Sequence, residues 1–159
     1  MFFVALVSLP IALACICGYF DVEIIGLGAQ LGGLLIVSSL FIALAALYAY
    51  KADSNFGFTV FALVAAGVFY AGYYGGDLTI NLTLGIIYLV CLVWSARIGT
   101  PKTLTVILLT TALIFIFGGI SVQTGEEIWG LLKGIAALAN FVLTLYLAYA
   151  LVDEKVPVI

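Results

Sequence analysis

The amino-acid sequence is apolar over nearly its whole length and is interrupted only by short polar breaks. A helix needs about 20 mostly apolar residues to cross the hydrocarbon core of a bilayer. Backbone N–H and C=O groups in lipid must pair within the segment, and these runs do not alternate as barrel strands do. We therefore predict an all-α, polytopic membrane protein with six transmembrane helices, short loops and a single domain, 1–159. The six predicted helices are Phe2–Phe20, Ile24–Tyr50, Phe56–Tyr74, Leu78–Ala96, Thr103–Val122 and Ile128–Val152.

The amino-acid composition indicates which kinds of partner the protein can bind. Of the 159 residues, 66% are hydrophobic and 8% are charged, whereas a soluble domain is about 45–50% apolar and about 25% charged. The few charged side chains cannot cover a soluble fold of this size. A net charge of -3 without a basic run gives no case for nucleic-acid binding. We expect a multi-pass protein whose partner is the lipid bilayer of the cell membrane, and no nucleic acid.

The charged residues separate onto two sides of the predicted bundle. The basic side, formed by the second and fourth loops and the C-terminal tail, holds Lys51, Arg97, Lys102 and Lys155. The opposite side holds Asp21, Glu23, Asp77, Glu126 and Glu127. Because cytoplasmic loops carry an excess of Lys and Arg, we predict that both termini are cytoplasmic. Lys133, inside the last helix, is expected to snorkel to the outer headgroups; the alternative is that it faces a water-filled vestibule.

Several kinds of chemistry have no residues to support them. The chain contains no His, and no Asp, Glu or Arg lies at mid-membrane depth in a predicted helix. Proton relays, ion sites and metal centres normally need such residues. Cys15, Cys17 and Cys91 all lie in apolar segments and are interpreted as packing residues. We therefore expect no metal, no cofactor and no enzymatic activity.

What remains at depth is a set of neutral polar and small side chains. A carboxamide such as Asn140 is costly in lipid unless it finds a partner or lines a wet path. Such groups suit the passage of a small solute with little or no charge. Gly28 and Gly32 lie four residues apart on the second predicted helix. Small residues at this spacing let helix backbones approach closely, so we expect Gly28 and Gly32 to pack against another helix of the same chain.

Three stretches carry a more specific signal. The first joins Asn55-Phe56-Gly57, Thr59 and Phe61 to Gly67, Phe69 and Tyr70; the second is Trp94–Gly119; the third is Leu145–Tyr149, followed by Asp153-Glu154. Together these cover about half of the chain. They resemble the acetate and succinate transporter family, which are small six-helix carriers or channels for short monocarboxylates. The family's N-terminal asparagine-proline-alanine-proline-leucine-glycine-leucine motif is absent from this sequence.

The resemblance implies a transporter or channel for acetate-like monocarboxylates. Because no buried cation is available to bind a carboxylate, we expect the neutral, protonated acid to cross more easily than the anion. The resemblance also implies a homo-oligomer, in this family a hexamer. The leucine of the family's pore constriction falls at Leu109 of this chain. Around it we expect polar pore lining from Thr110, Thr111 and Asn140, and aromatic walls from Phe56 and Tyr70.

Two alternatives stay open at this point. One is a channel for amides or urea, a second six-helix class that this chain resembles less. The other is a non-transporting structural subunit of a larger membrane complex, which would have other membrane subunits as its partners. Uptake of labelled solutes separates the first alternative from acetate transport, and co-purification in mild detergent tests the second.

Overall fold

The computed structural model describes residues 1–22, 24, 27–153 and 156–157, and in this part of the chain the regular structure is entirely helical. The predicted all-α class with six helices is confirmed. Each helix is long and apolar enough to cross a membrane, as a multi-pass membrane protein requires. The helices are α1 (Phe2–Tyr19), α2 (Leu27–Lys51), α3 (Asn55–Tyr74), α4 (Leu78–Ile98), α5 (Lys102–Thr124) and α6 (Glu127–Ala150).

Capping residues explain where several helices begin and end. The Ser54 hydroxyl and the Asp77 carboxylate each accept a backbone N–H from the first turn of α3 and of α4, respectively. The helices α3, α4 and α5 each end at a glycine in the left-handed conformation: Gly75, Gly99 and Gly125. Short polar breaks therefore stop the apolar helices and reverse the chain.

The predicted boundaries lie within three residues of those in the structure, and two of them extend a helix by two or three residues too far. The second helix was predicted from Ile24, but Ile24 is not helical, and α2 begins at Leu27 after residues that lie outside the described part. The last helix was predicted to reach Val152, but α6 ends at Ala150 and the next two residues form a turn. An apolar sequence continues past a helix end without a signal, because hydropathy measures solvent preference rather than backbone geometry.

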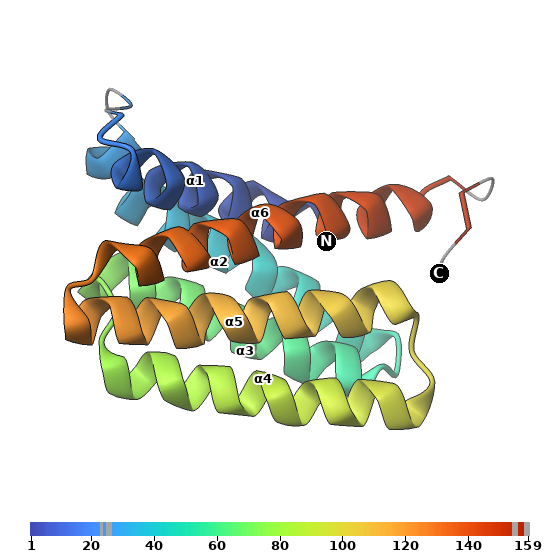
Figure 1. The fold of residues 1–159 in the computed structure, drawn as a ribbon. Coiled ribbons are helices and arrows are strands. Elements are labelled where there is room, and N and C mark those ends of the chain that lie inside the picture. The colour runs from blue at the N-terminus through green and yellow to red at the C-terminus, as the bar shows by residue number, and fades with distance from the viewer. Residues whose placement is uncertain (23, 25–26, 154–155, 158–159) are drawn as a thin grey trace.

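The six helices form a closed ring in chain order. Each helix packs beside its neighbours in sequence, and α1 closes the ring against α6. Within the described residues, helices on opposite sides of the ring make no close backbone contact. The turns α1–α2, α3–α4 and α5–α6 lie at one end of the bundle, on the left in Figure 1, and the other two turns lie at the opposite end. The first end carries Asp21, Asp77, Glu126 and Glu127 and is called the acidic end; the second carries Lys51, Arg97 and Lys102 and is called the basic end.

Contact between neighbouring helices is uneven around the ring. The helices α2 and α3 pack closely along their lengths, whereas α3 and α4 meet at few residues. The backbones of α2 and α3 approach each other closely at Gly32 and Gly72, where a Cβ on Gly72 would stand 2.8 Å from the Gly32 carbonyl oxygen. Gly28 lies one turn earlier in α2, and its surroundings fall outside the described side chains. The two helices form a tight hairpin that is loosely joined to α4.

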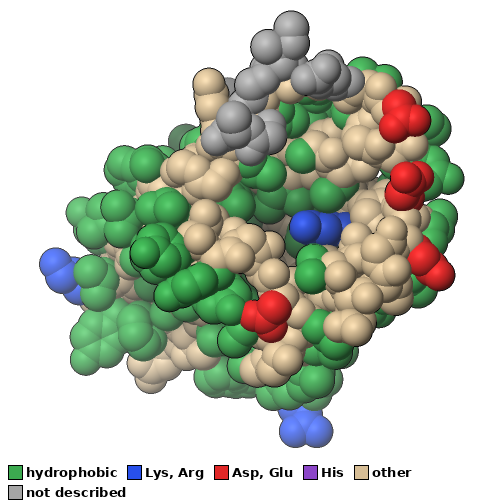
Figure 2. All heavy atoms as spheres, turned by 90° about the vertical axis from the view of Figure 1, so that its left-hand side faces the viewer, with side chains coloured by type: hydrophobic (Ala, Val, Ile, Leu, Met, Phe, Trp, Pro, Cys, Tyr) green, Lys and Arg blue, Asp and Glu red, His purple; other side chains and the backbone are tan. Residues whose placement is uncertain are grey.

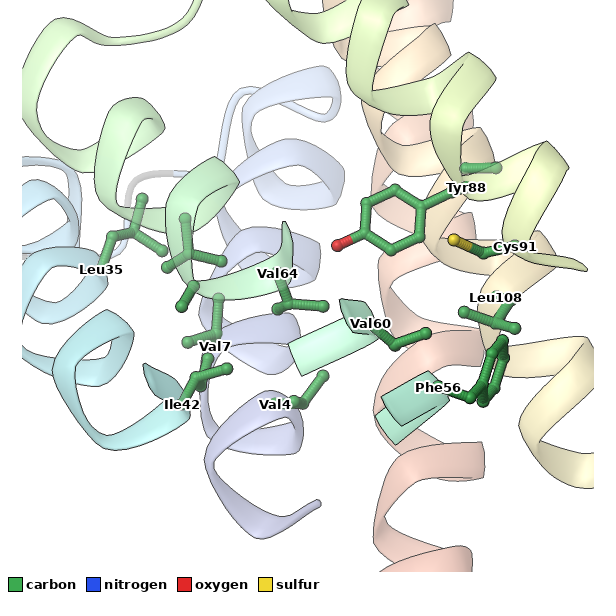
Figure 3. Close-up of a cluster of buried hydrophobic side chains, with 13 residues drawn as sticks. Val4, Val7, Leu35, Ile42, Phe56, Val60, Val64, Tyr88, Cys91 and Leu108 are labelled. Carbon is green, nitrogen blue, oxygen red and sulfur yellow. The ribbon is translucent and has the colours of Figure 1, made fainter. Parts of the chain in front are cut away.

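A cluster of buried apolar side chains runs along the interior of the ring and reaches the basic end. Figure 3 shows Val4 and Val7 of α1, Val60 and Val64 of α3, and Leu108 of α5 within this cluster. Because α3 and α5 begin at the basic end, their first turns supply Phe56, Val60, Leu104 and Leu108 to it. The apolar cluster therefore closes the interior of the ring on that side.

Candidate functional site

The ring encloses a cavity of about 340 Å³ that extends from the acidic end past the middle of the bundle and is lined by residues from all six helices. Gly75 and Gly76, in the turn between α3 and α4, lie at its mouth. Ser8, Thr111 and Asn140 lie in the deep part of the cavity and are called the floor, and Val4, one turn nearer the basic end than Ser8, also lines it. Figure 2 looks onto the acidic end and shows the hollow near the centre of that face. A cavity of this volume is within the range of small-molecule sites.

Asn140 is the centre of a buried hydrogen-bond network at the floor. Its Nδ2 donates to Thr110 Oγ1 at 2.8 Å, to Thr111 Oγ1 at 2.8 Å and to the Ile107 carbonyl at 3.2 Å. Its Oδ1 accepts a hydrogen bond from Ser8 Oγ at 2.9 Å. Ser8, Thr110, Thr111 and Asn140, called the polar cluster, tie together α1, α5 and α6 in the middle of the bundle.

The hydrogens of the polar cluster are all used within the protein. Thr110 and Thr111 donate to the Ile107 carbonyl at 2.9 and 2.8 Å, and Ser8 also lies 2.9 Å from the Val4 carbonyl. A hydroxyl has one hydrogen and two lone pairs, and a carboxamide has two hydrogens. The remaining capacity on the oxygens is therefore lone pairs. Toward the cavity, the floor offers hydrogen-bond acceptors and no spare donor.

The walls between the mouth and the floor are mostly apolar. Leu35 of α2, Val68 of α3 and Phe115 of α5 line them. Phe115 stacks on the buried ring of Tyr88, with 5.6 Å between ring centroids. The Tyr88 hydroxyl is completely buried and has no hydrogen-bond partner among the described residues. Beyond the floor, toward the basic end, the cavity is lined by apolar side chains such as Val4 and Ile42.

Lys133 lies at the mouth of the cavity. Of the two positions that the sequence leaves open, this matches the vestibule rather than snorkelling along the outside of the bundle. Lys133 lines the cavity from α6 and is half-buried. A Cβ on Gly118 of α5 would stand 3.5 Å from Lys133 Cδ and Cε, so the lysine stem crosses that glycine. Figure 2 shows a Lys or Arg side chain in the hollow, with acidic side chains on the same face. Among the described residues, the Lys133 ammonium has neither an ion pair nor a hydrogen bond.

The structure distributes the predicted pore residues among several environments. Thr111 and Asn140 line the cavity, and Thr110 is joined to them through Asn140. Leu109 lies on the outer surface of α5, with 40% of its area exposed, and the cavity is lined by other side chains. On a helix, the residue two positions from an inward-facing one points away from it, so Leu109 and Thr111 face different surroundings.

The two predicted aromatic wall residues lie at opposite ends of α3. Phe56 is buried in the apolar cluster near the basic end, where its ring meets that of Trp94 edge-on at a centroid distance of 5.1 Å. The Tyr70 hydroxyl donates to Asp77 Oδ2 at 2.5 Å at the acidic end. This hydrogen bond, followed by one from the Ile80 N–H, holds the pKa of the Asp77 carboxyl below its ordinary value. The cavity is lined by other side chains, while Phe56 packs near the basic end and Tyr70 binds the carboxylate that caps α4.

Sequence reasoning did not select Ser8 or Cys15, and it favoured a different position for Lys133. A signal for Lys133 was present, since it lies seven residues before Asn140 and a helix repeats its facing over that interval. Nothing comparable marked Ser8, because its role depends on α1 packing against α6, a contact between the two ends of the chain.

Comparison with known proteins does not assign a function, so the assignment rests on the residues of the cavity. No family model, no curated protein and no solved structure matches the chain. The class that the fold defines is thus a six-helix protein with the helix lengths and composition of a multi-pass membrane protein.

Proposed function

We propose that this protein is a transporter or channel for short, acetate-like monocarboxylates, with one path through each ring of six helices. The observation that supports it best is the central cavity, because side chains of all six helices line it and it opens at one end of the bundle. The apolar cluster closes the other end. A path open on one side and closed on the other is the arrangement that alternating access requires.

The chemistry of the floor indicates which form of the solute travels furthest. A carboxylate carries acceptors alone, and the floor offers lone pairs without a spare donor. The protonated acid carries an O–H that the Ser8 or Thr111 oxygen accepts, and it has no charge to desolvate. The neutral acid is therefore the form that passes the polar cluster, and flux increases as the external pH falls.

The direct test is uptake of labelled acetate into proteoliposomes, with empty liposomes measured in parallel because the undissociated acid also crosses lipid. We expect protein-dependent uptake between about pH 5 and 8, around and above the ordinary pKa of a carboxyl group. Equal uptake in both preparations across this range would exclude the proposal. Protein-dependent uptake of urea without acetate uptake would instead favour the amide channel.

A pair of variants on one helix locates the path. Thr111→Phe places a ring at the floor and is expected to abolish protein-dependent uptake, whereas Leu109→Phe adds the same ring to the outer surface and leaves uptake unchanged. If Leu109→Phe blocks uptake and Thr111→Phe does not, the constriction lies where the family resemblance places it. Thr111→Leu provides a smaller obstruction if the phenylalanine variant fails to fold, and size-exclusion chromatography checks each variant.

The assembly is part of the same proposal. A homo-oligomer of identical chains, a hexamer by family resemblance, is expected after purification in mild detergent. Native mass spectrometry measures the number of chains directly. Stoichiometric co-purification of other membrane proteins, together with absence of uptake, would instead favour a structural subunit.

A further inference from the structure

We infer that Lys133 binds the carboxylate of the solute at the mouth of the cavity, with the apolar end of the solute directed toward the walls. This inference rests on the proposed function in taking a small organic acid as the solute. It adds a binding residue, an orientation and a selectivity: short monocarboxylates are preferred over dicarboxylates and over neutral amides.

The position of Lys133 on α6 is the first step. Lys133 and Asn140 share the inward-facing side of the helix, about 10 Å apart along its axis at 1.5 Å per residue. The stem of Lys133 passes over Gly118 of α5, at the distance of van der Waals contact from a Cβ placed there. The ammonium group is thereby held in the mouth, above the polar cluster.

The surroundings of the ammonium are the second step. Lys133 is half-buried in a cavity whose other lining side chains are neutral, as far as the structure describes the chain. Its ammonium has no ion-pair partner within the described residues. A partly desolvated charge without a partner costs free energy, and an anion entering the mouth offsets that cost. The site is thus complementary to one negative charge.

The remaining walls determine the orientation. A carboxylate moved to the floor meets lone pairs of Ser8 and Thr111 and gains no donor. A hydrocarbon tail meets Leu35, Val68 and Phe115 and is removed from water there. The carboxylate therefore stays on Lys133 and the tail points inward.

The same argument excludes a solute that carries a second negative charge. The other carboxylate of a short dicarboxylate would lie against apolar walls, against the acceptors of the floor, or near the acidic side chains of this end, namely Asp21, Asp77, Glu126 and Glu127. Each of these positions is unfavourable for an anion. Acetamide has the size of acetate and lacks the charge that Lys133 recognises.

Cys15 provides a reporter that does not depend on transport. It lines the same cavity from α1, and a Cβ on Gly134, the residue after Lys133, would stand 2.9 Å from Cys15 Cβ. The experiment measures the rate at which Cys15 of the full-length protein, in phosphatidylcholine vesicles, reacts with an anionic and with a cationic methanethiosulfonate of similar size. A Cys15→Ser variant identifies the signal by removing this thiol and leaving Cys17 and Cys91.

In the unmodified protein we expect the anionic reagent to react about tenfold faster than the cationic one, relative to their rates with a free thiol, because Lys133 concentrates anions. Acetate and butyrate slow the reaction in a saturable way, and succinate and acetamide do not. Lys133→Gln removes both the preference and the protection, and Lys133→Arg retains them. The first two results need no substituted lysine, so they test the inference even if Lys133→Gln does not fold.

Several outcomes would overturn the inference. They are an equal rate for the two reagents, protection by succinate equal to that by acetate, or a preference for the anionic reagent that persists in Lys133→Gln. A phospholipid headgroup is the other source of an anionic oxygen for Lys133. If phosphatidylglycerol in the vesicles slows the reaction and acetate does not, the site binds lipid and the inference is wrong.

The results separate this inference from the proposed function. Protection of Cys15 by acetate without acetate uptake would support the carboxylate site and exclude transport. Acetate uptake without any effect of acetate on Cys15 would support transport and exclude Lys133 as the binding residue.

Discussion

Asn140 gives the polar cluster its stability because its one side chain bonds to residues of two other helices, α1 and α5. Each partner also has a bond within its own helix: Ser8 to the Val4 carbonyl, and Thr110 and Thr111 to the Ile107 carbonyl. If Asn140 is lost, the hydroxyl hydrogens therefore stay satisfied. The energetic cost of losing Asn140 is then set by the interhelical bonds themselves and by the space left behind.

We predict that Asn140→Ala lowers the free energy of unfolding by about 1–2 kcal/mol, since hydrogen bonds between membrane helices average less than 1 kcal/mol each and several are lost. Unfolding in a mixed detergent titration measures this difference. Gln30→Ala is the control, because Gln30 is an exposed carboxamide on the outside of α2 and its loss should change little. A loss equal to that of Gln30→Ala would contradict the prediction.

Tyr88 presents the opposite case, a buried polar atom without a partner in the described structure. Its ring stacks on Phe115, so the ring is useful to packing and the hydroxyl is not. Tyr88→Phe keeps the ring and removes the desolvation penalty, and we expect it to raise the free energy of unfolding by about 1 kcal/mol. The same titration measures it, with Tyr73→Phe at an exposed position as the control. Destabilisation by Tyr88→Phe would show that the hydroxyl has a partner in the folded protein.

At this scale the sequence predicts individual polar residues better than their partners. Asn140 is recognisable because a carboxamide in an apolar helix needs a bond or water. Leu109 was selected through family resemblance, and a one-dimensional alignment cannot distinguish it from Thr111, which is two residues away and faces the cavity. The role of Ser8 can be inferred only from the packing of α1 against α6.

Among the elements, the hairpin of α2 and α3 depends on backbone contact that side chains would prevent. A Cβ on Gly72 would lie 2.8 Å from the Gly32 carbonyl oxygen and 2.9 Å from Leu35 Cβ, both of them parts of α2 that cannot rotate away. Gly33, next to Gly32 in α2, has no heavy atom within 4 Å of such a Cβ. Alanine at Gly72 therefore tests the effect of close packing, and alanine at Gly33 tests the effect of helix propensity alone.

We predict that Gly72→Ala lowers the free energy of unfolding by about 1–3 kcal/mol, as overpacking in a close contact does. Gly33→Ala should be neutral or stabilising by up to about 1 kcal/mol, because alanine favours the helix and meets open space. Detergent titration of the two variants side by side gives the comparison. Equal effects at both positions would mean that the hairpin is not packed as described.

The start of α4 depends on an ionised carboxylate. Asp77 Oδ1 accepts the Ile80 N–H at 2.9 Å and Oδ2 accepts the Tyr70 hydroxyl at 2.5 Å, and these bonds lower the pKa of Asp77. A carboxyl whose folded pKa is lower than its unfolded pKa stabilises the fold above the unfolded pKa, which is about 3.9. That contribution is lost as the pH falls through the folded pKa.

Removing the phenolic hydroxyl with Tyr70→Phe is therefore expected to raise the pKa of Asp77 toward its ordinary value. The destabilisation caused by Tyr70→Phe should be fully present at neutral pH and should shrink below about pH 4. Carbon NMR of the labelled Asp77 carboxyl measures the pKa, and unfolding at several pH values measures the stability. In an Asp77→Asn background, Tyr70→Phe should lose its pH dependence. An unchanged Asp77 pKa in Tyr70→Phe would contradict this account.

For the whole molecule, the apolar runs predicted the number of helices and their positions because solvent decides both. They did not predict the cavity, since helices that are apolar all round give no sign of which face turns inward and which meets lipid. Lipid-facing residues such as Leu40 and Val90 are as hydrophobic as Val64 and Leu108 in the core. The apolar runs also did not predict the ring, because its closure depends on the packing of α1 against α6.

The sidedness of the cavity follows from the charge separation between the two ends. Basic residues concentrate at the end that holds Lys51, Arg97 and Lys102, and the positive-inside rule assigns that end to the cytoplasm. We therefore predict that the mouth, at the acidic end, opens to the exterior and that a solute enters it from outside the cell. In a background whose native cysteines are replaced by alanine, we predict that a membrane-impermeant maleimide labels Glu127→Cys in intact cells and labels Ala52→Cys only after lysis. Both positions are exposed, so accessibility within the protein does not decide the result. The reverse pattern would place the mouth in the cytoplasm, in which case Lys133 would meet its carboxylate on the way out of the cell and the protein would work as an exporter.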